Sequence, residues 1–191
     1  MSVEELNVRQ ARSLAGLASF SSLRRLILSG CDPVALDMLP ALGQLRMLRI
    51  EDSALDNLDG IASFSLLAAT LPRNFLKDLT PLLEVSSLLQ VDVSGNPLSE
   101  YSYQEVIPQL EANGCRVKGS GELEWRTTVH LHDGGVPVSV YADGSGYRLC
   151  RPGLALTDFP QYEHPVLSEV AVRSLLSGEP REAYAYFDQG R

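Results

Sequence analysis

A self-similar segment between Leu66 and Asn96 constrains the fold of this chain more than any other feature. Two units share one spacing of apolar residues and close on an asparagine: Leu66-x-x-Ala69-x-Leu71 with Asn74, and Leu88-x-x-Val91-x-Val93 with Asn96. The two asparagines are 22 residues apart. A period of this size is typical of proteins in which each repeat supplies one short strand and one return segment.

The same spacing occurs twice before this segment, with leading residues Leu23 and Leu45, and in a weaker form from Val3. From Leu23 onward the leading leucines are 22, 21 and 22 residues apart. Residues 3–118 resemble a bacterial-type leucine-rich-repeat protein, including a C-terminal cap similar to GNPLS…VIPQLEANGCRV. The resemblance implies an α/β fold: a right-handed solenoid over 1–118 with parallel concave strands, a capping helix at 100–113, a last short strand at Val117, and a function in binding protein.

Alternation along each strand predicts which side chains point inward. Leu26 and Leu28 are expected in the core, and Arg25 and Ile27 on the concave face. The residue that closes each unit must satisfy backbone groups that the turn leaves inside, a role that suits Asn74 and Asn96. Ser53 departs from this pattern. Pro72 removes a backbone donor from its strand, which predicts either a missing ladder bond or a bulge there.

The concave face is the candidate partner-binding site. Its expected outward positions combine arginine with methionine and leucine, a composition that protein interfaces favour. A solvated sheet face also needs charge, so an ordinary surface is the competing interpretation. The candidate partner-binding residues are Arg25, Ile27, Arg46, Met47, Arg49, Glu51, Leu67, Arg73, Gln90 and Asp92.

Residues 119–191 follow the break at Gly119-Ser120-Gly121 and resemble no known family. We expect a small α+β lobe packed on the solenoid, with antiparallel hairpins and one helix. The expected strands are 125–131, 136–141, 147–150 and 183–187, with hairpin turns at 132–135 and 142–146. A loop is expected at 160–165 and a helix at 165–176, with Val166, Val170, Leu175 and Leu176 in its core stripe and Gly178 ending it.

Charge and cysteine usage exclude several classes of function. The formal net charge of −8 disfavours nucleic acid, whose binding surfaces are basic. The first residues carry acid where a signal peptide needs base, and no apolar run approaches the roughly 18 residues of a membrane span. Cys31, Cys115 and Cys150 lack a C-x-x-C spacing and suit a reducing compartment. We therefore expect a cytoplasmic protein that binds neither nucleic acid nor membrane.

Candidate chemistry is confined to the last seventy residues. His130 and His132 would share one face of a strand, beside Asp133, and two imidazoles can begin a metal site; exposed histidines beside a turn are the competing interpretation. Residues 143–146 resemble half a calcium loop, but a hairpin turn explains them better. Phosphate-binding and nucleophile-elbow motifs do not occur, so we expect neither an enzyme nor a cofactor.

Two functions follow from these observations. The first is a non-catalytic protein-binding module, with an immunity-type protein that neutralises a toxin as its specific version. The alternative is an enzymatic or metal-binding C-terminal lobe that uses His130 and His132.

Overall fold

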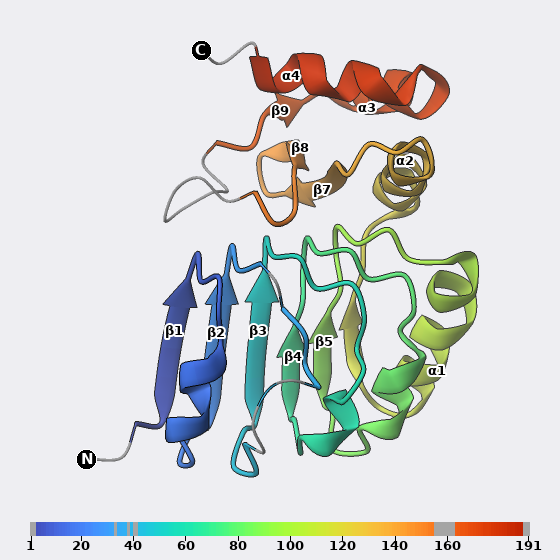
Figure 1. Ribbon diagram of the computed structural model, residues 1–191. Coiled ribbons are helices and arrows are strands. Elements are labelled where there is room, and N and C mark those ends of the chain that lie inside the picture. Colours follow the sequence, from blue (N-terminus) through green and yellow to red (C-terminus); the bar gives the residue numbers. More distant parts are fainter. Residues whose placement is uncertain (1–2, 33, 38, 40–41, 155–162, 189–191) are drawn as a thin grey trace.

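A parallel sheet and a smaller antiparallel sheet make up the computed structural model, which describes residues 3–32, 34–37, 39, 42–154 and 163–188. The parallel sheet has six strands in sequence order, and the antiparallel sheet has three (Figure 1). This is the α/β architecture expected for the first part. The parallel strands are β1 (Glu5–Arg9), β2 (Arg25–Ser29), β3 (Met47–Glu51), β4 (Ala68–Thr70), β5 (Gln90–Asp92) and β6 (Arg116–Lys118).

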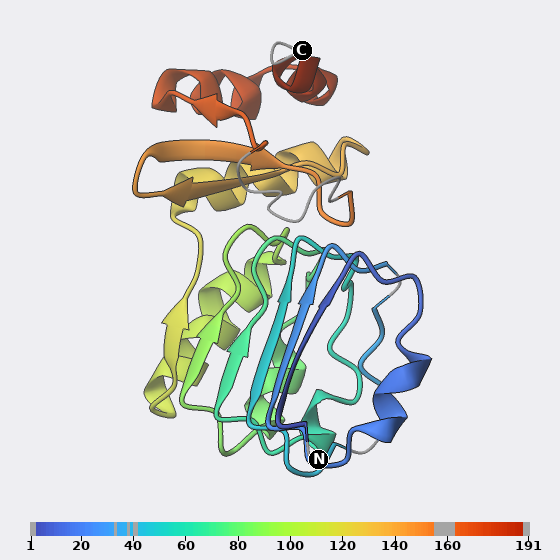
Figure 2. The same cartoon turned by 90° about the vertical axis from the view of Figure 1, so that its left-hand side faces the viewer.

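The segments that return the chain between strands lie on one side of the parallel sheet (Figures 1 and 2). Leucines of the strands and of these returns meet in one core, and Leu26, Leu28, Leu48 and Ile50 are almost completely buried there. The predicted alternation along the strands is therefore confirmed. The regular turns of the returns are η1 (Ala15–Ser19), η2 (Ile61–Ser63), η3 (Thr80–Glu84), the π-helical η4 (Ser102–Val106) and α1 (Ile107–Ala112).

The buried asparagines satisfy backbone groups at the turns, as predicted, and they also join successive repeats. The side-chain oxygen of Asn96 accepts from the backbone N–H of Asn74 at 3.2 Å and of Leu76 at 3.1 Å. Its amide donates to the carbonyls of Leu71 and Val93. Ser53, one repeat before Asn74, fills the same role although it is not an asparagine. Its hydroxyl accepts from the backbone N–H of Cys31 at 3.0 Å.

Pro72 lies just beyond the end of its strand. Strand β4 ends at Thr70, and the backbone N–H groups of Leu71 and Arg73 still donate to the next coil, at 2.7 and 2.8 Å. Pro72, between them, has no N–H to donate. Of the two outcomes predicted for this position, the missing ladder bond is the one found.

The capping segment is helical across the expected range, with one irregularity. The hydroxyl of Ser99 accepts from the N–H of Ser102 at 3.1 Å and so caps the beginning of the helix. The Ser102 hydroxyl accepts from the buried N–H of Leu79. Pro108 cannot donate within a helix, and the chain forms the π-helical η4 just before α1. The final short strand expected at Val117 is β6.

The C-terminal part differs from its prediction in three elements. Residues 125–131 form helix α2 (Glu122–Asp133) and not a strand. Residues 132–135 are consequently a helix end and not a hairpin turn. Residues 183–187 are helical and not a strand. The remaining elements are β7 (Ser139–Asp143), β8 (Gly146–Cys150), β9 (Val166–Leu167), α3 (Glu169–Ser177), η6 (Pro180–Tyr184) and α4 (Ala185–Asp188).

Of two other predictions for this part, the hairpin is correct and the helix is correct only in part. The hairpin at 142–146 is confirmed, and Asp143 accepts from the N–H and the hydroxyl of Ser145 in its turn. The expected helix at 165–176 begins later, at Glu169, where the Ser168 hydroxyl caps it. Val170 is 77% exposed and so lies outside the core stripe. Of the loop expected at 160–165, residues 160–162 lie outside the described residues, and residues 163–165 are without helix or strand, as predicted.

The C-terminal part lies over the carboxyl ends of the parallel strands (Figure 1). It has a core of its own, which includes Leu131, Val140 and Leu175. Trp125 belongs instead to the core of the parallel sheet, where its ring stacks on Tyr103 with centroids 4.0 Å apart. Within the described residues, no helix is long and apolar enough to cross a membrane.

Candidate functional site

The candidate site is the face of the parallel sheet that the returns do not cover. We call it the sheet face. The alternation along the strands turns these side chains away from the core. It consists of Glu5, Asn7, Arg9, Arg25, Ile27, Ser29, Met47, Arg49, Glu51, Ala68, Thr70, Gln90, Asp92, Arg116 and Lys118.

Arginine and apolar side chains alternate at the centre of the sheet face. The strand register places Arg25 beside Met47, and Ile27 beside Arg49. These four side chains, together with Ala68, line a shallow hollow. The Arg25 guanidinium contacts the Met47 sulfur at 3.3 Å, and Met47 remains 37% exposed. The hollow therefore offers apolar surface between two cations.

Three cations of the sheet face form ion pairs, two with an anion on the neighbouring strand and one with an anion on the same strand. Arg25 pairs with Glu5 at 3.1 Å, and Lys118 pairs with Asp92 at 2.8 Å. Arg49 pairs with Glu51 on its own strand. Exposed pairs of this kind contribute at most about 1 kcal/mol each to stability, so their cations can exchange partners easily.

Seven of the ten residues predicted to bind a partner lie on the sheet face, and three do not. Arg46 and Leu67 come just before β3 and β4, because each strand begins two residues after its leading leucine. The Arg46 guanidinium turns back to the carbonyls of Gly43 and Leu45. Leu67 is 43% exposed at the beginning of its strand. Their expected place on the sheet face is thus wrong.

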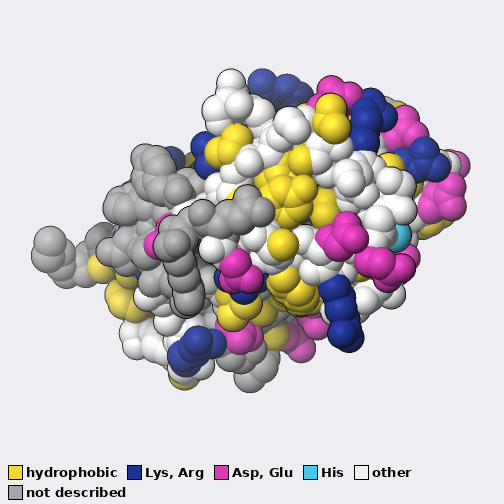
Figure 3. Space-filling model, turned by 90° about the horizontal axis from the view of Figure 1, so that it is seen from above, with side chains coloured by type: hydrophobic (Ala, Val, Ile, Leu, Met, Phe, Trp, Pro, Cys, Tyr) yellow, Lys and Arg dark blue, Asp and Glu magenta, His cyan; other side chains and the backbone are white. Residues whose placement is uncertain are grey.

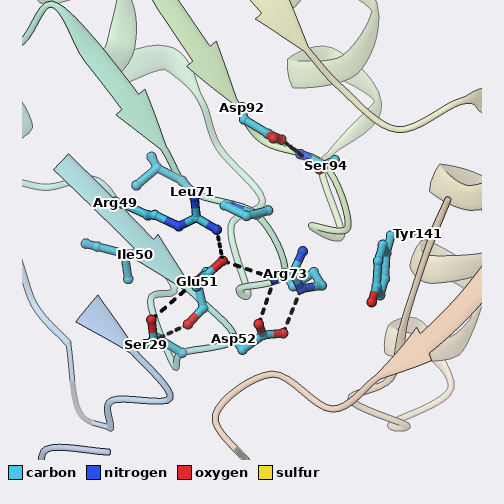
Figure 4. Close-up of polar contacts among 12 residues, drawn as sticks. Ser29, Arg49, Ile50, Glu51, Asp52, Leu71, Arg73, Asp92, Ser94 and Tyr141 are labelled. Atoms are coloured by element: carbon cyan, nitrogen blue, oxygen red, sulfur yellow. Dashed lines mark hydrogen bonds and ion pairs between the residues drawn. The ribbon is translucent and has the colours of Figure 1, made fainter. Parts of the chain in front are cut away.

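Arg73, the third exception, is largely but not completely buried at the carboxyl end of the sheet. It follows β4 in a left-handed conformation with φ of 55°, and its side chain is only 13% exposed. Two nitrogens of its guanidinium donate to the two carboxylate oxygens of Asp52, each at 2.7 Å (Figure 4). Burial opposes the charge of Arg73, but the hydrogen bonds and charge of Asp52 outweigh it and raise the pKa of the guanidinium. Arg73 is therefore a structural residue.

Glu51 connects the sheet face to this buried pair. One of its carboxylate oxygens accepts from the Ser29 hydroxyl at 3.2 Å, and the other accepts from both Arg49 and Arg73 (Figure 4). Burial tends to raise the pKa of Glu51, but the bonds and charges of the two arginines hold it below its usual value. Glu51 is thus an anion with three donors.

The buried pair also meets the C-terminal part, which the repeat spacing does not indicate. The Arg73 guanidinium lies over the Tyr141 ring, 4.9 Å from its centroid. The Tyr141 hydroxyl is hydrogen-bonded to Nδ1 of His164 at 2.9 Å, and Nε2 of His164 lies 3.9 Å from Asp52. Burial, followed by the nearby arginines, lowers the pKa of His164 to about 4, although Asp52 partly opposes this. The histidine is therefore neutral at pH 7.

His130 and His132 do not form a shared site. Residues two apart on a helix point in nearly opposite directions, and these two bond to different groups. Nε2 of His130 lies 3.1 Å from the Gly178 carbonyl, whereas Nε2 of His132 lies 3.3 Å from the Ser139 hydroxyl. In the described part of the chain, no group of three or more histidine, cysteine or acidic residues is placed to hold a metal ion.

A second exposed surface lies on the outer side of the C-terminal part. Val166, Val170 and Tyr184 are exposed on β9, α3 and η6. Figure 3, which looks down on this part, shows hydrophobic side chains near the middle of the face with charged side chains around them.

Comparison with known proteins adds no relative to these observations. Neither a scan against protein-family models nor a search of curated proteins found a match to this chain.

Proposed function

We propose that this chain is a non-catalytic protein-binding module of the leucine-rich-repeat type, acting in the cytoplasm, whose sheet face receives the partner. Three features support a repeat solenoid: the 22-residue period, one parallel strand in each repeat, and the buried ladder that joins Cys31, Ser53, Asn74 and Asn96. A rigid ladder of this kind presents the outward side chains in a fixed array.

The single observation that carries the proposal is the hollow at the centre of the sheet face. Arg25, Ile27, Met47 and Arg49 combine there, and arginine and methionine are enriched at protein interfaces while lysine is depleted. The six strands span about 24 Å, at roughly 4.8 Å for each neighbouring pair. With the rim of the C-terminal part, this suits a standard interface of about 800 Å² per partner.

The specific version of this function is an immunity-type protein that neutralises a toxin. An acidic, small chain that blocks a partner by covering its surface needs no catalytic group of its own. This version rests on analogy with other proteins that use such repeats, because a fold hosts many functions.

Site-specific photo-crosslinking tests the proposal. A photoreactive amino acid at position 47 places the probe in the hollow, and the same group at the exposed Arg173 of α3 is the matched control. We expect the probe at position 47, in a lysate of the source organism, to join the chain to one protein that the control does not capture. That protein, once purified, should bind the Arg49→Ala variant about 30-fold more weakly, equivalent to about 2 kcal/mol.

The control for the titration is Glu122→Ala, at an exposed position of α2. It should change the affinity by less than about fivefold. Equal and small effects of Arg49→Ala and Glu122→Ala would place the binding site away from the sheet face and overturn the proposal.

A further inference from the structure

The sheet face has the opposite charge to the rest of the molecule. Its strands present five cations, Arg9, Arg25, Arg49, Arg116 and Lys118, and three anions, Glu5, Glu51 and Asp92, a net charge of +2. The whole chain has 16 basic and 24 acidic residues, so the remainder carries −10. A partner drawn by the overall charge would be basic, whereas a partner of the sheet face meets a positive surface.

In two of the three ion pairs of this face the cation also projects further than its anion, whereas Arg25 is 44% exposed and its partner Glu5 56%. The Arg49 side chain is 48% exposed and its partner Glu51 only 17%. The Lys118 side chain is 70% exposed and its partner Asp92 only 18%. An approaching molecule therefore reaches the guanidinium and the ammonium before it reaches either carboxylate.

Both of these cations can leave their present partners without stranding an anion. Glu51 would keep its bonds from Ser29 and Arg73 if Arg49 moved away. Asp92 would keep its bonds from the backbone N–H of Ser94, at 3.0 Å, and from the Ser94 hydroxyl, at 2.6 Å. The large penalty for an unpaired buried anion is thus avoided in both exchanges.

We propose that the segment of the partner that seats on the sheet face is acidic and extended, with carboxylates at alternate positions. This inference rests on the proposed function and names the chemistry of its partner. Arg25 and Arg49 are diagonal neighbours on adjacent parallel strands, so the strand spacing and the rise of two residues separate their Cα atoms by about 8 Å. Alternate residues of an extended chain lie about 7 Å apart, so successive carboxylates can reach the two arginines. Ile27 and Met47 lie between the two arginines and contact the methylene groups of these acidic side chains.

Binding of short synthetic peptides tests this inference. The probe is a fluorescein-labelled peptide in which aspartate alternates with leucine, and its binding is followed by fluorescence anisotropy at low and at high salt. Matched peptides replace aspartate with asparagine or with lysine. We expect the aspartate peptide to bind at least about tenfold more tightly than either, and to lose that advantage as salt screens the charges.

Variants locate the binding. Arg25→Gln and Arg49→Gln should each weaken binding of the aspartate peptide at least about fivefold. Arg173→Gln, an exposed arginine on α3, should leave the affinity unchanged. Thermal melts of the variants, expected to match the wild type, exclude unfolding as the cause.

Several results would overturn the inference. Absence of aspartate-peptide binding, equal binding of the asparagine peptide, or loss through Arg173→Gln would each do so. Tight binding of a single-stranded oligonucleotide, or self-association abolished by Arg49→Gln, would replace the acidic segment with nucleic acid or a second copy. These results can be distinguished from failure of the proposed function. If the proposed function is wrong, a probe at position 47 gives no specific crosslink.

Discussion

The guanidinium of Arg73 holds both carboxylate oxygens of Asp52, a residue 21 positions earlier, through two hydrogen bonds of 2.7 Å. Both residues are in the left-handed region, with φ of 55° and 49°, which non-glycine residues seldom adopt. The turns after β3 and β4 thus bring a cation and an anion together beneath Tyr141. The C-terminal part rests on the parallel sheet over this pair.

Removing the cation of this pair should destabilise the fold strongly. In Arg73→Gln the carboxylate of Asp52, only 4% exposed, would lose its charged partner. We expect the free energy of unfolding to fall by about 3–5 kcal/mol. Arg49→Gln is the matched control. Because the Arg49 side chain is exposed, loss of its pair with Glu51 should lower the free energy of unfolding by less than about 1 kcal/mol. Denaturant titrations decide the matter, and equal losses would show that the Arg73 pair is not structural.

The asparagine ladder predicts a second loss of stability. Asn96→Ala leaves the buried N–H groups of Asn74 and Leu76 without their acceptor, so we expect a loss of about 1–3 kcal/mol. Asn7→Ala, on the exposed side of β1, should remain within about 0.5 kcal/mol of the wild type. Thermal melts in which both variants behave alike would contradict the role assigned to Asn96.

Trp125 should be essential where the C-terminal part joins the parallel sheet. Its ring stacks on Tyr103, and its N–H donates to the Leu98 carbonyl at 2.8 Å. Trp125→Ala removes both contacts and should lower the free energy of unfolding by about 3–5 kcal/mol. Trp125→Phe keeps an aromatic ring but loses the hydrogen bond, so its loss should be smaller. Denaturation followed by circular dichroism compares them, and an unaffected alanine variant would refute the prediction.

Mild acid should destabilise the protein through two histidines whose pKa values are lowered in the folded state. Burial is the first cause of the pKa of about 4 for both His132 and His164, followed by Lys77 for His132 and partly opposed by nearby carboxylates. An unfolded histidine binds a proton below about pH 6.5, whereas these folded ones do so only below about pH 4. The unfolded state therefore holds more protons between these values, and stability falls as pH falls from about 6.5 to about 4.

The size of this effect is on the order of 3 kcal/mol for each histidine. Unfolding measured across this pH window in the wild type and in a His132→Gln/His164→Gln variant tests it. We expect the variant to show a flatter pH dependence. A variant with the same slope as the wild type would assign the acid sensitivity to other groups.

The repeat spacing alone predicts most of the first 118 residues. Each repeat contacts its neighbours about 22 positions away, so a local pattern repeated along the chain also specifies the contacts between coils. The spacing therefore assigns Leu26, Leu28 and Leu48 to the core, and Asn74 and Asn96 to the turns, and all five are buried. The expected positions of Arg46 and Leu67 are wrong because the spacing does not determine the residue at which pairing begins.

Helix α2 shows why the C-terminal part is harder to predict. Trp125, Thr127, Val129 and Leu131 alternate as a strand would, and Thr and Val favour strands by propensity. The tertiary structure buries Trp125, Thr127, Thr128 and Leu131 on a helix that packs against both β7 and α3. Contacts on more than one side remove the simple periodicity that identifies an amphipathic helix.

The sequence by itself thus determined the repeat period, the parallel strands and the buried ladder, since these depend on neighbours at a constant spacing. Only the tertiary structure separated Arg49, which faces solvent, from Arg73, which is buried, although the repeat spacing assigns both to the same face. The burial of Arg73 depends on a left-handed backbone after β4 and on Asp52, Tyr141 and His164. Asp52 lies one repeat before Arg73, but Tyr141 and His164 come from outside the repeats, so the repeat spacing does not encode their contact with this pair.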